Sequence, residues 1–441
     1  MTVSVASTIS RKWTASTTRR LLSRLLAGDL NFHKSPSNYA SHSIHAFAAK
    51  FPPQLPRVFI EGLTDPRETV LDPMMGSGTA IVEAFLANRR VVGFDIDLLA
   101  LLICRVKTMP VDFLEASWAG KRIVSYAYRL LEKPSYLDEI MVKRYDRASL
   151  DFIEYWFSKE TQRQLMALLL AFAHEKPEDR LEAFLKVVFS SIIITKSGGV
   201  SLAYDLAHSR PHRVATKIPK DAIKTFEQRL LKCADLLSQL PRNGKNVQIG
   251  QYDCRQDLPL NDNSVQLIVT SPPYANAIDY MRAHKFSLVW FGESIEMLSA
   301  LRAQYIGSER TSDLMEIRLP SQVRRIISLV EAKDTKRGRV LTKYFQEMGA
   351  AICQMHRVLE PGRACVIVVG SSEMRGVEIS THQCLSTLAE EHGFEVVEIA
   401  PRKLDRNRRM MPAGFLRNHN SQIESRMHEE YVVGLVKSPR A

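Results

Sequence analysis

The sequence predicts an α/β fold in which a seven-stranded, mostly parallel sheet carries a large helical insertion. Seven short apolar runs have the length of strands, and helical patterns separate most of them. Such alternation implies a parallel sheet that helices cover on both faces. The first predicted strand ends at residues 70–71, and the other six are residues 91–94, 247–252, 265–270, 364–369, 394–399 and 431–436.

A long interval separates the second and third predicted strands. About 150 residues lie between them, whereas a crossover between parallel strands needs about a dozen. Apolar residues recur there at helical spacing, so we expect residues 116–246 to form a helical insertion that could be a separate lobe. The sheet domain then comprises residues 41–115 and 247–441, with a second, shorter, charged insertion around residues 305–340.

The composition restricts the partners and the compartment. The chain has 441 residues, 45% of them apolar, and a formal net charge of +12, which favours polyanionic partners over a merely basic surface. No apolar run reaches the ~18 residues of a membrane span, so no membrane partner is expected. Six cysteines without a C-x-x-C pair indicate free thiols in a reducing, cytoplasmic compartment, and no metal site is predicted.

Residues 1–40 are predicted to form a basic N-terminal arm. No acidic residue precedes Asp29, and residues 17–26 have the pattern of a basic amphipathic helix. A transit peptide shares this composition, but no small-residue cleavage pattern is present. We therefore favour an arm that contacts a phosphate backbone, or a helix that docks on the core.

A glycine-rich turn, residues 72–79 (DPMMGSGT), follows the first predicted strand and precedes a helical pattern. Glycine lets the backbone pass close to a ligand. Asp72 lies at the carboxyl end of the strand, where ligands bind in Rossmann-like sheets and a carboxylate can hold an ammonium group. The second strand ends about twenty residues later at Asp95, where an acid can bind ribose hydroxyls; Asp97 is the competing candidate. The pattern predicts a site for a nucleoside-containing cofactor, with a purely structural turn as the alternative.

The fourth predicted strand runs into the tetrapeptide Ser271-Pro272-Pro273-Tyr274. The prolines end the strand and remove backbone donors, which leaves nearby carbonyls unpaired. The exocyclic amine of a base is a poor nucleophile because its lone pair is delocalised into the ring. Ser271 Oγ and the Pro272 carbonyl can accept its two hydrogens and free the lone pair to attack a methyl sulfonium, while an extruded base stacks on Tyr274. A proline turn after a buried strand is the alternative.

A helical pattern follows the tetrapeptide and is expected to pack on the sheet. Met281, Leu288 and Trp290 recur at helical spacing. This placement would bring Tyr280 and Arg282 near the substrate.

Together these segments resemble the amino-methyltransferases of DNA, which modify cytosine N4 or adenine N6. The resemblance implies S-adenosylmethionine as the cofactor. Residues 45–53 (HAFAAKFPP) resemble the segment that closes over the methionine end of the cofactor, and Asp253 matches the acid that meets its adenine amine. The residues that the resemblance and the turn assign to the cofactor are Lys50, Phe51, Asp72, Met74, Gly76, Ser77, Gly78, Thr79, Asp95, Ile96, Asp253 and Cys254.

The tetrapeptide matches the catalytic motif of the same family. Serine at its first position is typical of the cytosine-N4 branch, whereas aspartate is typical of adenine-N6 enzymes. Two features depart from the family pattern. Met74 stands where Phe is usual, and the large insertion does not occupy the usual place of a target-recognition region.

Basic segments in the insertion and near the C-terminus are candidate nucleic-acid contacts, which makes the insertion a candidate DNA-recognition lobe. Arg can pair bidentately with guanine, and all three basic residue types can contact phosphate. The run at residues 402–409 leaves the sixth strand, which should place it near the active face. Solvated loops are the alternative for each segment. The candidates are Arg210, His212, Arg213, Lys217, Arg406, Arg408 and Arg409.

The leading interpretation is a site-specific DNA methyltransferase that transfers a methyl group from S-adenosylmethionine to N4 of a flipped-out cytosine. Its expected partner is double-stranded DNA, in the nucleoid of a prokaryote, and such enzymes commonly protect host DNA beside a restriction endonuclease. The alternatives are an adenine-N6 DNA enzyme, an RNA base methyltransferase and a nucleic-acid binder that has lost catalysis. The intact acids, glycines and tetrapeptide argue against the last alternative.

Overall fold

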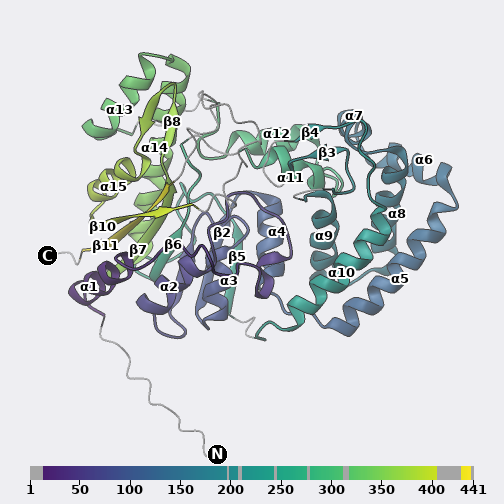
Figure 1. The fold of residues 1–441 in the computed structure, drawn as a ribbon, viewed down its shortest axis with the longest axis horizontal. Coiled ribbons are helices and arrows are strands. Elements are labelled where there is room, and N and C mark those ends of the chain that lie inside the picture. The colour runs from purple at the N-terminus through teal and green to yellow at the C-terminus, as the bar shows by residue number, and fades with distance from the viewer. Residues whose placement is uncertain are drawn as a thin grey trace, which may run out of the picture.

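The computed structural model describes residues 13–195, 198–206, 211–242, 246–275, 279–310, 317–404 and 429–438. Its centre is one seven-stranded sheet (Figure 1), and each of the seven predicted strands is part of it. The strands are β1 (Thr69–Asp72), β2 (Arg90–Asp95), β5 (Val247–Gln251), β6 (Val265–Thr270), β7 (Leu359–Gly370), β10 (Phe394–Lys403) and β11 (Glu429–Lys437).

The sheet has the strand order β10-β11-β7-β6-β1-β2-β5. Five neighbouring strands pair in parallel, in the order β7, β6, β1, β2 and β5. Strand β11 lies antiparallel between β7 and β10. The five parallel strands follow the order of a Rossmann-like sheet, in which the chain leaves β1 first toward one edge and later toward the other. Ligands bind at the carboxyl ends of the strands beside this switch point, here between β1 and β6. The predicted α/β fold class is therefore confirmed.

Alternate residues of the strands feed two hydrophobic layers. Val70 and Val366 belong to the layer under the first helices, whereas Leu71 and Ile367 belong to the layer on the opposite face. The first layer is covered by α1 (Ala15–Leu26), α2 (Gln54–Leu63), α3 (Thr79–Leu86) and α4 (Leu98–Lys107). The second is covered by α13 (Ser321–Glu331), α14 (Thr335–Val358) and α15 (Thr381–Glu391).

The predicted insertion is helical and lies beside the sheet (Figure 1). Its helix α9 packs on α4, and its buried Phe189 and Phe226 belong to the same hydrophobic cluster as Val70 of the sheet. The insertion thus extends the core of the sheet domain and does not have a core of its own. Its helices are α5 (Phe113–Leu131), α6 (Pro134–Arg144), α7 (Arg147–Trp156), α8 (Lys159–Glu175), α9 (Asp179–Ile193) and α10 (Ala222–Ser238).

Four short strands were not predicted from the sequence. They pair as two small antiparallel sheets, one inside the helical insertion and one after β7. Strands of two or three residues show too little alternation to be recognised in a sequence. They are β3 (Ala203–Tyr204), β4 (His212–Arg213), β8 (Ser372–Met374) and β9 (Val377–Ile379).

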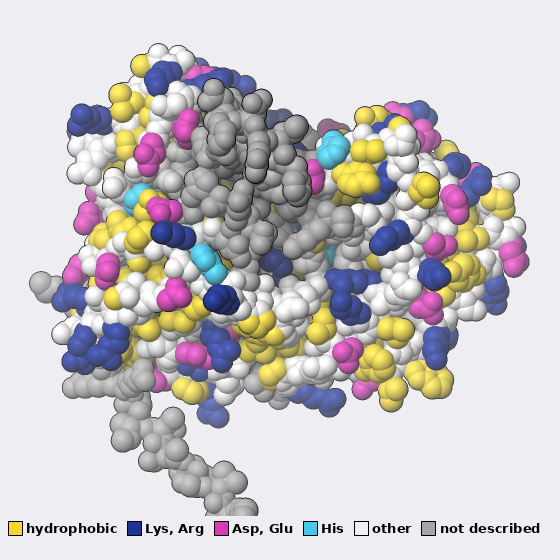
Figure 2. All heavy atoms as spheres, viewed as in Figure 1, with side chains coloured by type: hydrophobic (Ala, Val, Ile, Leu, Met, Phe, Trp, Pro, Cys, Tyr) yellow, Lys and Arg dark blue, Asp and Glu magenta, His cyan; other side chains and the backbone are white. Residues whose placement is uncertain are grey.

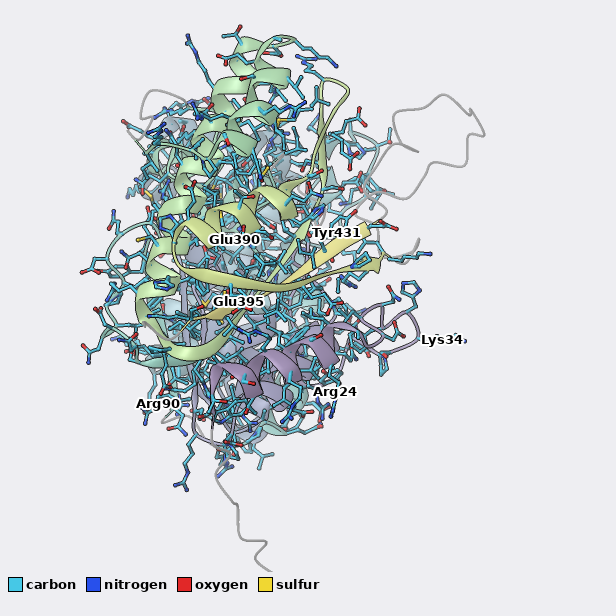
Figure 3. All side chains as sticks on the ribbon, turned by 90° about the vertical axis from the view of Figure 1, so that its left-hand side faces the viewer. Arg24, Lys34, Arg90, Glu390, Glu395 and Tyr431 are labelled. Atoms are coloured by element: carbon cyan, nitrogen blue, oxygen red, sulfur yellow. The ribbon has the colours of Figure 1, made fainter. Side chains whose placement is uncertain are left out.

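The basic helix of the N-terminal arm docks on the sheet. Figure 3 shows α1 beside β10 and β11, with Arg24 on its outer side. Thr14 caps the helix, Leu22 and Leu26 are buried, and Arg19 forms an ion pair with Glu395 of β10. Of the two roles favoured for the arm, the structure shows the docked helix; residues 1–12 lie outside the described residues.

The helix after the tetrapeptide, α11 (Met281–Leu288), packs on α4, α9 and α12 (Ile295–Ala303). The prediction that it packs on the sheet was wrong. The insertion supplies aromatic surface at this position, and Phe286 packs 4.8 Å from Trp156 between ring centroids. This arrangement joins the segment after the tetrapeptide to the insertion.

The glycine turn between β1 and α3 is held by backbone bonds and a buried lysine. The Met75 amide donates to the Phe94 carbonyl at 3.0 Å, and Lys107 Nζ donates to the Ser77 carbonyl at 2.9 Å. Gly78 is the N-cap of α3 with φ +76°, and a Cβ there would lie 2.2 Å from Cys104 Sγ. Both the backbone conformation and the space therefore require glycine.

We predict that Gly78→Ala destabilises the protein by about 2–4 kcal/mol, because a left-handed conformation and overpacking add their costs. The free energy of unfolding in urea measures the effect. Gly349→Ala in α14 is the matched control, since its Cβ would make only ordinary van der Waals contacts, with Leu388 Cδ2 at 3.8 Å and His392 Nε2 at 3.9 Å. It should stabilise by about 0.5–1 kcal/mol. Equal effects of the two variants would contradict the packing argument.

Candidate active site

A cavity of about 550 Å³ opens at the carboxyl ends of β1, β2, β5 and β6. Its wall includes every residue predicted for cofactor binding except Gly78, which caps α3 behind the turn. All four residues of the tetrapeptide also line it. Segments from distant parts of the sequence thus share one cavity because parallel strands end at the same edge of the sheet.

Two carboxylates form the floor of the cavity. Asp72 is 2% exposed, and burial raises its pKa to about 7. The carboxylate of Asp95 accepts the Gly76 amide at 2.8 Å and the Asp97 amide at 2.9 Å, while burial and the nearby Asp97 carboxylate raise its pKa to about 6. Buried carboxylates with raised pKa values favour a cationic or hydroxyl-rich ligand beside them.

Asp97, the competing candidate for the ribose, is committed to structural contacts. It caps α4 through the Ala100 amide at 2.8 Å, and it accepts hydrogen bonds from His284 Nδ1 at 2.8 Å and from the Tyr305 hydroxyl. Burial opposes its ionisation, but His284 and these hydrogen bonds hold its pKa below the usual value. The geometry therefore favours Asp95 for a ligand hydroxyl.

The segment predicted to close over the cofactor lies along the same cavity. Phe47 stacks on Tyr280 at 5.3 Å, and it leaves room beside Gly76, whose φ is +50°. Lys50 and Phe51 also line the cavity, and Lys50 Nζ donates to the His42 carbonyl at 3.1 Å. A Cβ at Gly76 would meet the Phe47 ring at 3.3 Å, so glycine keeps this part of the cavity open.

His45 anchors that segment to the insertion. Burial lowers its pKa to about 3, so the imidazole is neutral. Its Nδ1 donates to the Ala46 carbonyl at 2.6 Å, and its Nε2 accepts from Ser190 of α9 at 2.8 Å. Ser190 Oγ in turn lies 2.8 Å from Ser287 Oγ of α11. The helical insertion is therefore in direct contact with the predicted cofactor segment.

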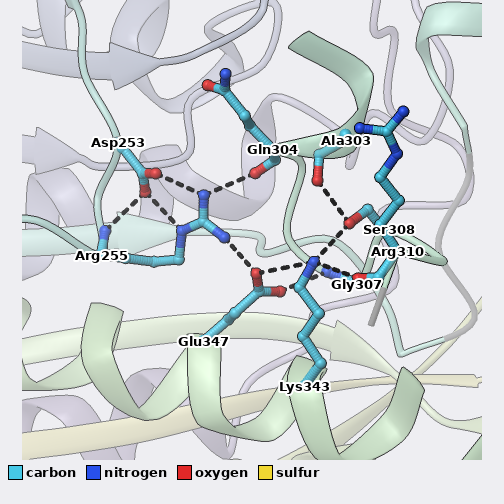
Figure 4. A network of polar contacts seen from close by, with 9 residues as sticks. All are labelled: Asp253, Arg255, Ala303, Gln304, Gly307, Ser308, Arg310, Lys343 and Glu347. Carbon is cyan, nitrogen blue, oxygen red and sulfur yellow. Dashed lines mark hydrogen bonds and ion pairs between the residues drawn. The ribbon is translucent and has the colours of Figure 1, made fainter. Parts of the chain in front are cut away.

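Asp253, assigned to the adenine amine, belongs to an ionic network (Figure 4). Arg255 Nε donates to Asp253 Oδ1 at 2.8 Å, and Arg255 also pairs with Glu347 of α14. Lys343 donates to Ser308 Oγ at 2.8 Å. The network holds residues 304–310 along the cavity wall, and any contact of Asp253 with an adenine amine would be shared with Arg255.

The tetrapeptide is fixed at two points. The Tyr344 hydroxyl of α14 donates to the Pro273 carbonyl at 2.9 Å, and the Tyr274 hydroxyl donates to Glu430 at 2.7 Å. Among the described residues, no hydrogen bond uses the Ser271 hydroxyl or the Pro272 carbonyl. These two acceptors therefore remain available to a ligand at the cavity wall.

The predicted nucleic-acid residues occupy different settings. Lys217 is buried, donates to the Ala203 carbonyl at 2.7 Å and lies over the Tyr204 ring; burial lowers its pKa to about 8. His212 is exposed, and Arg213 lies over the Tyr155 ring while donating to the Tyr155 carbonyl at 2.7 Å. Arg210, Arg406, Arg408 and Arg409 lie outside the described residues. Lys217 is thus a poor candidate for phosphate contact.

Positive charge is not confined to one patch. Figure 2 shows Lys and Arg side chains over both the sheet domain and the helical insertion. At the cavity itself, five exposed cations line the wall, and Asp279 pairs with two of them, Arg282 and Arg302. The five are Lys50, Arg282, Arg302, Arg310 and Lys336.

Several residues that line or support the cavity were not predicted from the sequence. Arg255 follows Asp253 by two positions, and that spacing of opposite charges was a usable signal. Tyr305 and Lys107 carry no local signal, because their partners Asp97 and Ser77 are distant in sequence. Within the described parts of the chain, no cluster of His, Cys, Asp or Glu could hold a metal, and no helix is long and apolar enough to span a membrane.

The acid at the tip of β2 can be tested by comparing two variants. Asp95→Ala should weaken S-adenosylmethionine binding about tenfold or more, since hydrogen bonds to a charged group are lost. Asp97→Ala should mainly lower the free energy of unfolding, by about 1 kcal/mol for the cap alone. Calorimetric titration and urea unfolding separate the effects. Unchanged affinity in Asp95→Ala would move the ribose assignment to Asp97.

The cofactor affinity should depend on pH through Asp72. Only the ionised carboxylate attracts an ammonium group, so affinity is lost as the pH falls through the raised pKa of about 7. Between pH 7.5 and pH 6 the affinity should drop roughly tenfold, as the ionised fraction does. Asp72→Asn should bind weakly with no such dependence. A pH-independent wild-type affinity over this range would remove Asp72 from the ammonium site.

Comparisons with known proteins agree with this geometry. The family described as DNA methylase matches residues 8–103. The type II methyltransferase M.MvaI of Kocuria varians is 24% identical over 421 residues, covering 90% of this chain and 92% of that protein. M.AvaI of Nostoc sp. is 25% identical over 380 residues, covering 75% and 74%.

A solved structure, the TehB-like SAM-dependent methyltransferase of Corynebacterium glutamicum, covers 87% of each chain at 9% identity with a TM-score of 0.29. That overlap is low, so the fold assignment rests on the strand order described above. The cavity suits S-adenosylmethionine because its floor presents acids to a cationic ligand and its glycine turn leaves room beside them. These matches support a DNA amino-methyltransferase family for this chain, with S-adenosylmethionine as its cofactor.

Proposed function

We propose that this protein methylates N4 of cytosine in double-stranded DNA. One observation carries the proposal: the tetrapeptide and the acids of the predicted cofactor site face the same cavity. A methyl donor held at Asp72 and Asp95 would therefore share the cavity with a base held at Ser271. The match to the family described as DNA methylase supports a DNA substrate, and both relatives named above are type II methyltransferases.

The free acceptors of the tetrapeptide supply the chemistry that an amine needs. S-adenosylmethionine, when bound, supplies an electrophilic methyl group on a sulfonium. Ser271 Oγ and the Pro272 carbonyl accept the two amine hydrogens, which draws the nitrogen toward a tetrahedral shape. The nitrogen lone pair would then be free to bond to the methyl carbon of the bound donor, which would leave as a neutral thioether, and one amine hydrogen would pass to solvent as a proton. No covalent link to the protein is needed.

The recessed position of the tetrapeptide requires a base that has left the helix. A base within a duplex cannot reach an active-site cavity, so such enzymes extrude it and stack it on an aromatic side chain. Tyr274 supplies that ring. The exposed cations at the cavity, including Arg310 and Lys336, supply charge for the flanking phosphates. A cognate restriction endonuclease is the further partner that the family resemblance implies.

The identity of the base rests on Ser271. Serine at this position favours cytosine N4, and adenine N6 is the second candidate within the same chemistry. Both reactions use an exocyclic amine, so the geometry of the acceptors alone does not separate them.

A methyl-transfer assay followed by nucleoside mass spectrometry tests the proposal. The protein is incubated with S-adenosylmethionine and, separately, with unmethylated genomic DNA and total RNA, and the digests are analysed. N4-methylcytosine in DNA is the expected product. N6-methyladenine would show that Ser271 does not select the base, and a methylated RNA base would replace the substrate. No product on either polymer would favour a binder that has lost catalysis.

We predict that Ser271→Ala loses most of the turnover, about tenfold or more, because one acceptor for the amine hydrogens is gone. Cofactor affinity should stay within about twofold of the wild type, since the acids of the cofactor site are unchanged. Turnover with saturating DNA and calorimetric titration give the two quantities. Wild-type turnover in this variant would remove Ser271 from the reaction.

A further inference from the structure

The hydroxyl of Tyr274 ends in a buried ionic contact that the proposed chemistry does not use. It donates to Glu430 Oε1 at 2.7 Å, and Glu430 Oε2 is paired with Arg402. Arg402 Nε also donates to the Leu30 carbonyl at 3.1 Å. Glu430 is 8% exposed and Arg402 is 4% exposed. A relay of three side chains thus runs from the cavity wall into the sheet.

The register of the sheet builds this relay. Arg402 of β10 and Glu430 of β11 are directly opposite each other in the antiparallel ladder. Paired residues of an antiparallel ladder project to the same face, so the two charges meet without distortion. A buried ion pair is weak evidence for stability, because desolvation offsets most of its Coulomb energy. Its direct bond to a residue of the tetrapeptide suggests a different role.

A stacking platform is useful only if its ring does not rotate. An exposed tyrosine samples several rotamers and loses that freedom when a base stacks on it. Tyr274 is bound at both ends: Tyr344 holds the neighbouring Pro273 carbonyl, and Glu430 holds the hydroxyl. Burial and the Glu430 carboxylate raise the pKa of Tyr274 well above its ordinary value, so it remains a donor.

We propose that Glu430, oriented by Arg402, is a positioning residue that fixes the plane of the Tyr274 ring for the extruded base. The inference rests on the proposed base methylation. It assigns a functional role to the pairing of β10 with β11, at the edge of the sheet away from the predicted cofactor acids. The relay touches neither Asp72 nor Asp95, so its effect should be separable from cofactor binding.

The central variant is Tyr274→Phe, which keeps the ring and removes only the hydroxyl. We expect kcat on unmethylated DNA to fall about tenfold, because a ring that is no longer held places the base less often. The KM for DNA and the affinity for S-adenosylmethionine should stay within about twofold, since phosphate contacts dominate DNA affinity. Unchanged kcat would overturn the proposal, as would a loss that only follows a lowered melting temperature.

The matched control is Tyr431→Phe. Tyr431 follows Glu430 on β11, so its ring lies on the opposite face of the strand, where it stacks on His382 at 3.6 Å. This variant removes the hydroxyl oxygen of a nearby tyrosine that does not line the cavity. It should leave kcat unchanged. An equal loss in both variants would show that the effect is general to β11 and would overturn the proposal.

A mutant cycle tests whether the hydroxyl acts through Glu430. Glu430→Ala is combined with Arg402→Met, because a lone buried guanidinium would be destabilising. Adding Tyr274→Phe to this pair should lower kcat by no more than about twofold further, since one contact is lost only once. Additive losses of kcat would show that the Tyr274 hydroxyl does not act through Glu430 and would overturn the proposal. A wild-type protein that methylates no base would overturn the proposed function and this inference together, whereas active wild type with normal variants would overturn only the inference.

Discussion

The hydrogen bond from the Gly76 amide to the Asp95 carboxylate joins the tips of β1 and β2, and the cavity is arranged around it. Parallel strands bring their carboxyl ends to one edge, and the positive φ of Gly76 lets the turn direct this amide toward the neighbouring strand. Lys107 supports the turn from beneath through the Ser77 carbonyl. The remaining cavity walls lie around this turn.

Opposite charges occupy different parts of the cavity. Acids occupy the floor, where burial raises the pKa values of Asp72 and Asp95, and cations such as Arg310 and Lys336 occupy the exposed wall. A cationic methyl donor lowers the cost of ionising the floor, while a polyanion is attracted to the wall. One cavity can thus hold two ligands of opposite charge without conflict.

The helical insertion lies at the outside of the molecule and also contacts the segments that line the cavity. His45 contacts Ser190 of α9, and α11 packs on the same helix. Asp97, at the tip of β2, binds His284 of α11 and Tyr305 beyond α12. One packed unit is therefore formed by the predicted cofactor segment, the segment after the tetrapeptide and the insertion. A shift of α9 would displace both the residues proposed to hold the cofactor and those proposed to hold the base.

The sequence by itself determined the seven strands, the glycine turn and the tetrapeptide, because each depends on a local pattern: short apolar runs, a glycine-rich turn or prolines that end a strand. For the ribose contact, the sequence offered Asp95 and Asp97 as two competing candidates. The structure placed both, since the partners of Asp97 lie 187 and 208 residues away and no local pattern encodes such contacts. The same reason explains why α11 was placed on the sheet and why the relay from Tyr274 to Glu430 was not foreseen. Contacts between distant segments follow from packing in three dimensions, where register and the shape of neighbouring helices decide which side chains meet.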